Sequence, residues 1–287
     1  MLDVITVFIS IIVEATPFLL IGTLIAVLVQ KYNLFNRLIH RLPSNLFLRR
    51  ISISLLGVAL PVCECGNVPL ARSLMRRGLS VSEATTFLLA APILNPVTFI
   101  ATKEAFRSAP WMLPARMLGG FFTALLIGEV IGRIKGGALR SDFISTCKKS
   151  NLQKERSKKF TIQFAEEFLG MFKLLAMGGA IASLTQLIIN QNTFSDISNN
   201  YIVGVGIMLV VGFIISICSS VDAFFALGYA GTFRYGALLA FLIAGPMVDI
   251  KLLAMLKNTY AQKALYVLVA SVATLSLIIG LVASYVR

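Results

Sequence analysis

Two stretches of this 287-residue sequence carry no charged residue over the full length needed to cross a membrane. Residues 201–221 and 264–286 are continuous apolar runs, and about 20 such residues form a helix that spans roughly 30 Å of hydrocarbon. Apolar residues make up 57% of the chain and charged residues only 14%, which is not the composition of a water-soluble fold. The runs are continuous rather than alternating, which excludes a transmembrane β-barrel. The sequence therefore predicts an all-α polytopic membrane protein.

The distribution of positive charge predicts the topology. The chain has 26 Lys and Arg against 13 Asp and Glu, and cytoplasmic loops are the loops enriched in Lys and Arg. If residues 51–77 and 201–233 each enter the membrane and return on the same side, one face carries 19 basic residues and the other four. The basic face then comprises segments 31–50, 66–82, 133–163 and 257–263. Eight full spans, the alternative, give 14 against nine at best. We therefore expect six crossings, two re-entrant helical hairpins, and both termini outside.

The two halves of the chain follow one plan. A first transmembrane repeat (1–134) and a second (164–287) are separated by a basic cytoplasmic linker (135–163). One 12-residue segment shares six identities with the segment 156 residues later, and Asn95 corresponds to Asp249 at an offset of 154. Three crossings per half is an odd number, so we expect inverted-topology repeats, as in many secondary transporters.

The strongest local signal is the sequence PVCECGNVP at residues 61–69. Its prolines and glycine break a helix, and broken helix is tolerated in a membrane only inside protein or beside a cavity. The thiols of Cys63 and Cys65 are soft ligands that suit thiophilic metals or metalloids. Glu64 and Asn67 add polar groups. Small buried apolar cysteines are the alternative, but the polar context favours a substrate site in which both thiols are metal or metalloid ligands.

The sequence CSSVD at residues 218–222 takes the corresponding place in the second half. Inverted repeats bring opposed breaks to the membrane midplane, where the substrate binds. We therefore expect Ser219, Ser220 and Asp222 to share one substrate site with the first motif. A carboxylate at the outer surface is the alternative for Asp222.

Glu14 and Asp249 are further carboxylates inside apolar runs. An ionised carboxylate at the bilayer centre costs at least about 2.5 kcal/mol, so it should face the bundle interior, pair with a cation or bind a proton. Glu14, Asp222 and Asp249 are therefore candidates for proton coupling, with a structural pairing role as the alternative. Asp249 and Lys251 are two residues apart and would point to different sides of a helix, so we expect no ion pair between them.

Asn95 lies between Pro92 and Pro96 and is expected to break its helix, which would free carbonyl groups for a cation or a solute. A simple proline kink is the alternative. Arg116 is expected to be an interfacial anchor. The sequence has no P-loop, Rossmann or G-x-S-x-G signature, so we expect neither a cofactor nor an enzyme.

These motifs resemble those of the predicted-permease family that contains the ArsP-type organoarsenical efflux permeases. The matching text is PVCECGNVPLARSLMRRG and FLLAAPILNPV in the first half, and SSVDAFFALGYAG and FLIAGPMVDIKLLAML in the second. With matching length and a basic central linker, the resemblance covers nearly the whole chain. It implies an inner-membrane permease and, for the arsenical branch, export of trivalent organoarsenicals through contacts that map to Cys63 and Cys65.

We therefore expect a bacterial inner-membrane permease that moves a small thiophilic solute past Cys63 and Cys65. A reduced-sulfur anion or a divalent metal is the alternative solute. A membrane thiol oxidoreductase or a metal-assembly partner is the alternative from another class of function, although a C-x-C disulfide closes a very tight ring. The basic segments favour anionic lipid headgroups as partners rather than nucleic acid. A homo-oligomer or a second membrane subunit is compatible with the sequence.

Overall fold

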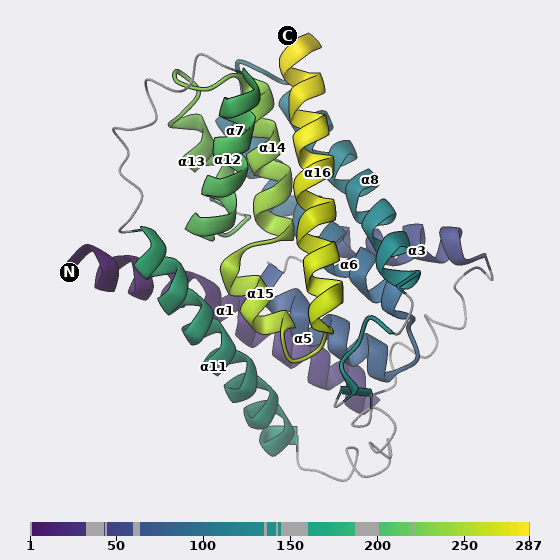
Figure 1. Cartoon of the computed structure of the whole chain (residues 1–287). Coiled ribbons are helices and arrows are strands. Elements are labelled where there is room, and N and C mark those ends of the chain that lie inside the picture. The colour runs from purple at the N-terminus through teal and green to yellow at the C-terminus, as the bar shows by residue number, and fades with distance from the viewer. Residues whose placement is uncertain are drawn as a thin grey trace.

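The computed structural model of the chain is helical, with no β-strand among the residues it describes (Figure 1). The described residues are 2–32, 43, 45–59, 64–134, 137–141, 143–144, 160–186, 201–219 and 221–286. The first half contains α1 (Leu2–Tyr32), α3 (Leu46–Ser54), α4 (Leu56–Ala59), α5 (Glu64–Arg76), α6 (Val81–Leu94), α7 (Pro96–Ala105) and α8 (Met112–Gly132). The second half contains α11 (Phe160–Gln186), α12 (Tyr201–Ile215), α13 (Asp222–Leu227), α14 (Tyr235–Met247), α15 (Ile250–Leu256) and α16 (Gln262–Val286).

Several of these helices suit a membrane. Within the described chain, α8, the α14–α15 segment and α16 are long and apolar enough to cross one, and α6 with α7 forms a fourth candidate bent by 42°. Helices α1 and α11 have 31 and 27 residues, which exceeds the roughly 20 that a span needs. The prediction of an all-α multi-pass membrane protein is thereby supported. The six crossings and the re-entrant hairpins stay predictions.

The bend between α6 and α7 lies at Asn95, which confirms the predicted break. Asn95 is the N-cap of α7, and its side-chain oxygen accepts a hydrogen bond of 2.9 Å from the Val97 amide. Pro96 has no N–H to donate to the preceding turn. The hydroxyl of Thr98 donates instead to the Pro92 carbonyl at 2.8 Å. Polar side chains therefore satisfy two backbone groups at the break.

The sequence predicts one span over residues 235–256, and a break that matches the one at Asn95 divides it. Helix α14 ends at Met247, and Asp249 is the N-cap of α15, where its carboxylate accepts a hydrogen bond from the Leu252 amide. The sequence predicted a continuous span here. Asp249 thus has the same structural role in the second half that Asn95 has in the first.

The apolar run 201–221 is not one helix. Helix α12 ends after 15 residues, a length of about 22 Å, and Ser216 follows it with φ 54°. That left-handed backbone is unusual for a residue other than glycine and ends the helical hydrogen-bond pattern. Residues 216–219 and 221 are not helical, and α13 begins at Asp222.

The helices of the two halves pack in corresponding pairs. Helix α6 packs on α8, α14 packs on α16, and the two pairs contact each other through α6 with α14 and α8 with α16. Short helices also pack against short helices of the other half: α5 packs against α15, and α13 packs against α7. Helices α7 and α13 lie toward the end of the molecule where α16 finishes, and α5 and α15 lie toward the opposite end (Figure 1). Helices α1 and α11 depart from this correspondence, since α1 packs on α5 but α11 packs on α15.

Glycine allows the closest helix contact beside the cysteine motif. A Cβ on Gly22 of α1 would lie 2.4 Å from the carbonyl oxygen of Gly66 in α5. Such backbone contact through small residues is a common way to associate helices in a membrane. Because Gly66 directly follows Cys65, this contact holds the first turn of α5 against α1.

Candidate functional site

The structure brings the described parts of the two predicted motifs together. Glu64 is the first residue of α5, and Ser219 lies between α12 and α13. The hydroxyl of Ser219 donates to Glu64 Oε2 at 3.3 Å, and the Cys218 thiol lies 3.9 Å from the same oxygen. Glu64 and Ser219 are each only 1% exposed. Two polar segments that are far apart in the sequence therefore meet inside the protein.

The ammonium group of Lys251 lies at the centre of this cluster. Its Nζ is 3.2 Å from Glu64 Oε1, 3.2 Å from the carbonyl oxygen of Ser216 and 3.6 Å from Asp249 Oδ2. Lys251 is 2% exposed. The expectation that Asp249 and Lys251 do not pair was wrong. It treated both residues as helical, whereas Asp249 is an N-cap with extended backbone angles, so its side chain turns back over the first turn of α15.

Two free thiols belong to the same segments. Cys65 and Cys218 are buried and form no disulfide; Cys65 directly follows Glu64, and the Cys218 thiol lies 3.9 Å from Glu64 Oε2. One thiol comes from each polar break. Cys63 and Ser220 lie outside the described residues, so the structure gives no geometry for the complete C-x-C pair. Among the residues that the structure does describe, no group of three or more His, Cys, Asp or Glu side chains could hold a metal ion.

A second buried ion pair joins Arg116 of α8 to Asp222, the first residue of α13. Arg116 Nη2 lies 2.5 Å from Asp222 Oδ2, and Nη1 donates to the Thr102 hydroxyl at 2.7 Å. The prediction of an interfacial anchor was wrong, because Arg116 is 0% exposed. A guanidinium is stable inside the bundle only with such partners, and here the carboxylate comes from 106 residues away.

The two ion pairs connect the halves in opposite directions. Glu64 of the first half pairs with a lysine of the second, whereas Asp222 of the second half pairs with an arginine of the first. Both carboxylates stand at the first residue of a helix that follows a polar break, where the helix dipole favours negative charge. The pairs differ in charge balance. The Lys251 cluster contains two carboxylates and one ammonium, and the Arg116 pair contains one of each.

The remaining predicted residues take other positions. Asn67 is fully buried in α5, one turn after Glu64. Asn95 is 4% exposed and uses its side-chain oxygen as the cap of α7. Glu14 belongs to α1, but its side chain lies outside the described part of the structure. Sequence reasoning missed Lys251 and Arg116 as members of the site, although both are charged residues within apolar segments, which is the signal that could have identified them.

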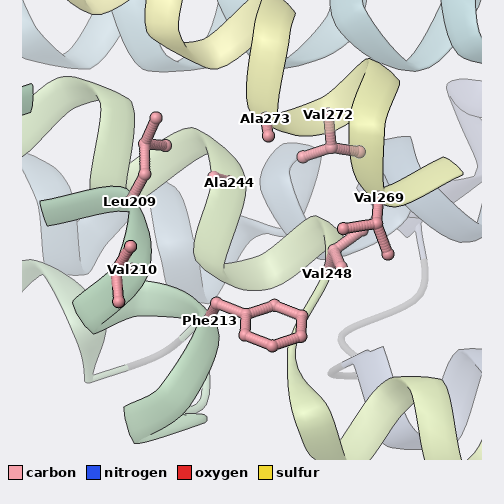
Figure 2. Close-up of a pocket in the computed structure, with 8 residues that line it drawn as sticks. All are labelled: Leu209, Val210, Phe213, Ala244, Val248, Val269, Val272 and Ala273. Carbon is pink, nitrogen blue, oxygen red and sulfur yellow. The ribbon is translucent and has the colours of Figure 1, made fainter. Parts of the chain in front are cut away.

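An apolar pocket of about 200 Å³ lies between α12, α14 and α16. Figure 2 shows its lining side chains, all of them apolar: Leu209, Val210, Phe213, Ala244, Val248, Val269, Val272 and Ala273. Val248 directly precedes Asp249 and is the nearest link in sequence between the pocket and the cluster. The pocket supplies no charge or hydrogen-bonding side chain, so the chemistry of the site resides in the cluster.

Comparison with known proteins places the chain in a family. Residues 1–285 match a family of proteins described as predicted permeases. The chain is 32% identical to "UPF0718 protein YcgR" of Bacillus subtilis (strain 168) over 282 residues, which cover 95% of this chain and 94% of that protein. It is 29% identical over 266 residues, covering 91% of this chain and 88% of the other, to a Streptococcus mutans serotype c protein named "Putative two-component membrane permease complex subunit". No solved structure matches the chain significantly. With its apolar helices and this match over nearly its whole length, the chain belongs to the ArsP-type predicted permease family.

Proposed function

We propose that this membrane transporter moves a small thiophilic solute, such as a trivalent organoarsenical, through the cluster around Lys251. The observation that carries the proposal is that each polar break supplies one buried free thiol: Cys65 directly follows Glu64, and the Cys218 thiol lies 3.9 Å from Glu64 Oε2. Soft sulfur ligands suit trivalent arsenic. A pair of thiols from two different segments can hold a solute in the occluded state and release it when the segments separate.

The proposed substrate site extends beyond the two thiols. Cys63 precedes Cys65 by two residues and would add a third sulfur ligand. The polar groups expected to contact the rest of the solute are Glu64, Asn67, Asn95, Ser219, Ser220 and Asp222. The hydrogen bond from Ser219 to Glu64 supports the participation of both motifs in one site. Sulfur ligands from two segments, with hydrogen-bonding groups beside them, suit a small solute with one thiophilic atom.

The proposed architecture is a pair of inverted repeats, 1–134 and 164–287, joined by the basic linker 135–163. Three observations support it. Asn95 and Asp249, aligned at an offset of 154 residues, cap the second helix of matching broken pairs. Short helices of one half pack against short helices of the other, and the two pairs lie at opposite ends of the molecule (Figure 1). Under the positive-inside rule, the linker faces the cytoplasm of a bacterial inner membrane and both termini lie outside.

Proton coupling is proposed for the carboxylates of the Lys251 cluster. In the described part of the chain, Glu64 and Asp249 share the single ammonium of Lys251, so one negative charge of this buried cluster is not balanced by a cation there. Protonation of one of the two carboxylates removes that unbalanced charge, and a site of low dielectric constant favours the neutral form. Asp222 is a weaker candidate because Arg116 neutralises it. Glu14 remains a prediction from the sequence.

The test is flux in proteoliposomes that contain the purified protein, with a trivalent methylarsenical, thiosulfate and Zn²⁺ as separate solutes. We expect flux of the arsenical, and we expect Cys65→Ser and Cys218→Ser each to reduce it at least tenfold. Cys147→Ser, the same chemical change in the linker, is the matched control and should leave the rate unchanged. Flux of thiosulfate or Zn²⁺ without the arsenical would assign the alternative solute. Full arsenical flux in the Cys65→Ser, Cys218→Ser double variant would contradict a thiol site.

A further inference from the structure

We propose that the ammonium group of Lys251 occupies an alkali-cation site, in place of a free ion, in a cage of oxygen atoms from Glu64, Asp249 and the Ser216 carbonyl. The cage would bind the cation rather than the solute. Any role of the cage in transport rests on the proposed function, but the thermal unfolding test on the purified protein does not.

The cage consists of hard oxygen ligands from three separate segments. Glu64 Oε1 comes from the start of α5, the Ser216 carbonyl from the end of α12, and Asp249 Oδ2 from the cap of α15. The hydroxyl of Ser219, bonded to the other carboxylate oxygen of Glu64, is a fourth oxygen next to the cage. Carboxylate, carbonyl and hydroxyl oxygens form the ligand set of hard cations, and the thiols suit soft ones.

The backbone around the cage also has the form of a cation site. Ser216 follows the last turn of α12 and has a left-handed conformation, so its carbonyl is not part of a helix. In membrane transporters, carbonyls of unwound helix and the C-terminal ends of half-helices coordinate the coupling cation. The negative end of the α12 dipole adds to the attraction.

The surroundings of the Lys251 ammonium would destabilise its positive charge if the oxygen atoms of the cage were not there. It is the second residue of α15, and a positive charge in the first turn of a helix is opposed by the helix dipole. A lysine side chain 2% exposed inside an apolar bundle also loses its hydration. Three oxygen contacts within 3.6 Å offset both costs. The cluster therefore holds the cation by a covalent tether instead of recruiting it from solution.

Unused oxygen atoms indicate a cage built for an ion rather than for a hydrogen-bonded network. Among the described residues, Asp249 Oδ2 and Ser216 Oγ are buried and have no hydrogen-bond partner. Asp249 Oδ2 nevertheless lies 3.6 Å from the ammonium nitrogen, a distance of charge attraction rather than of a formed hydrogen bond. Without the lysine side chain, Glu64 Oε1, Asp249 Oδ2 and the Ser216 carbonyl oxygen would surround a space that an alkali ion can occupy.

The experiment is thermal unfolding of purified wild-type and Lys251→Ala protein in detergent, in NaCl, KCl or choline chloride at equal ionic strength. Choline is too large for the cage and serves as the reference cation. Wild-type protein should unfold at the same temperature in all three salts. Lys251→Ala should unfold at a lower temperature in choline chloride and gain roughly 5 °C or more in NaCl or KCl, as expected for an ion well above its dissociation constant.

Arg116→Ala is the matched control, because it removes a buried cation beside a carboxylate without leaving a cage. Within the described residues, the Arg116 guanidinium hydrogen-bonds to one carboxylate, Asp222, and one hydroxyl, Thr102, rather than to oxygens of three segments with two carboxylates, so the three salts should give equal unfolding temperatures. The proposal is overturned if wild-type protein is itself stabilised by Na⁺ or K⁺ over choline, if folded Lys251→Ala is indifferent to the cation, or if Arg116→Ala gains as much as Lys251→Ala. Should Lys251→Ala not fold in any salt, Lys251→Ser, which adds a hydroxyl ligand, replaces it. Failure of both variants to fold in every salt also contradicts the proposal, since an alkali ion would then not replace the ammonium. None of these measurements depends on which solute the protein transports.

Discussion

Lys251 Nζ lies 3.2 Å from Glu64 Oε1, and this ion pair joins the second residue of α15 to the first residue of α5. The two residues are 187 positions apart in the chain. The contact therefore connects the start of α5 in the first half to the first turn of α15 in the second half. Any motion that separates α5 from α15 must break it.

The first prediction concerns the charges of this pair. Lys251→Met leaves Glu64 and Asp249 without a cation in a buried site, and removing one partner of a buried pair costs about 3–5 kcal/mol. The double variant Lys251→Met, Glu64→Gln removes one charge of each sign and should recover part of that loss. Thermal unfolding in detergent, in choline chloride, measures both. A double variant no more stable than the single one would show that the ion pair does not hold α5 against α15.

The second prediction concerns the geometry of Arg116. Its two terminal nitrogens contact Asp222 and Thr102 at once, which a lysine cannot do with one nitrogen. Arg116→Lys should therefore lower the unfolding temperature although it keeps the charge. Thr102→Val, which removes one acceptor of a hydrogen bond from a charged group, should cost about 1.5–3 kcal/mol. Wild-type stability in Arg116→Lys would argue that charge alone, and not the two-point contact, stabilises α13 against α7 and α8.

The third prediction concerns the contact between α1 and α5. Gly22→Ala places a methyl group 2.4 Å from the Gly66 carbonyl oxygen, so α1 must move away from the cysteine motif. We expect lower thermal stability and slower solute flux. Gly170→Ala in α11 is the matched control, because a Cβ there meets no atom within 4 Å, and alanine is favoured over glycine in a helix by about 0.5–1 kcal/mol. Equal behaviour of the two variants would mean that the α1–α5 contact is not tight.

Local signals in the sequence predicted local features well. The bend at Asn95 follows from prolines on both sides of it, and the all-helical fold follows from uncharged apolar runs. The positions of Arg116 and Lys251 could not be predicted in this way. Whether a cation in an apolar segment reaches the surface or stays inside depends on where a carboxylate from another part of the chain lies. For Arg116 that carboxylate is 106 residues away, and periodicity within one helix carries no information about it.

The break at Asp249 shows an intermediate case. No proline follows it as Pro96 follows Asn95, so the local signal is weaker and the sequence favoured a continuous span. The offset of 154 residues had already aligned the two positions. Internal correspondence therefore carried information that local propensity did not, because an aspartate is as good an N-cap as an asparagine.

The last prediction concerns orientation in the membrane. Single cysteines introduced into a cysteine-less variant at Asn45, Ser150 and Asn258 should react with a membrane-impermeant maleimide only from the cytoplasmic side, and one at Ser195 only from the outside. The reason is that basic segments remain in the cytoplasm, and the segments around the first three positions hold most of the Lys and Arg of the chain. Asn45 and Ser150 decide between the two topologies, because eight full spans would place them on opposite faces, whereas six crossings with two re-entrant hairpins place them on the same face. Labelling of Asn45 from one side and Ser150 from the other would contradict the inverted repeats and would leave the meeting of Glu64 and Ser219 as a contact between two complete spans.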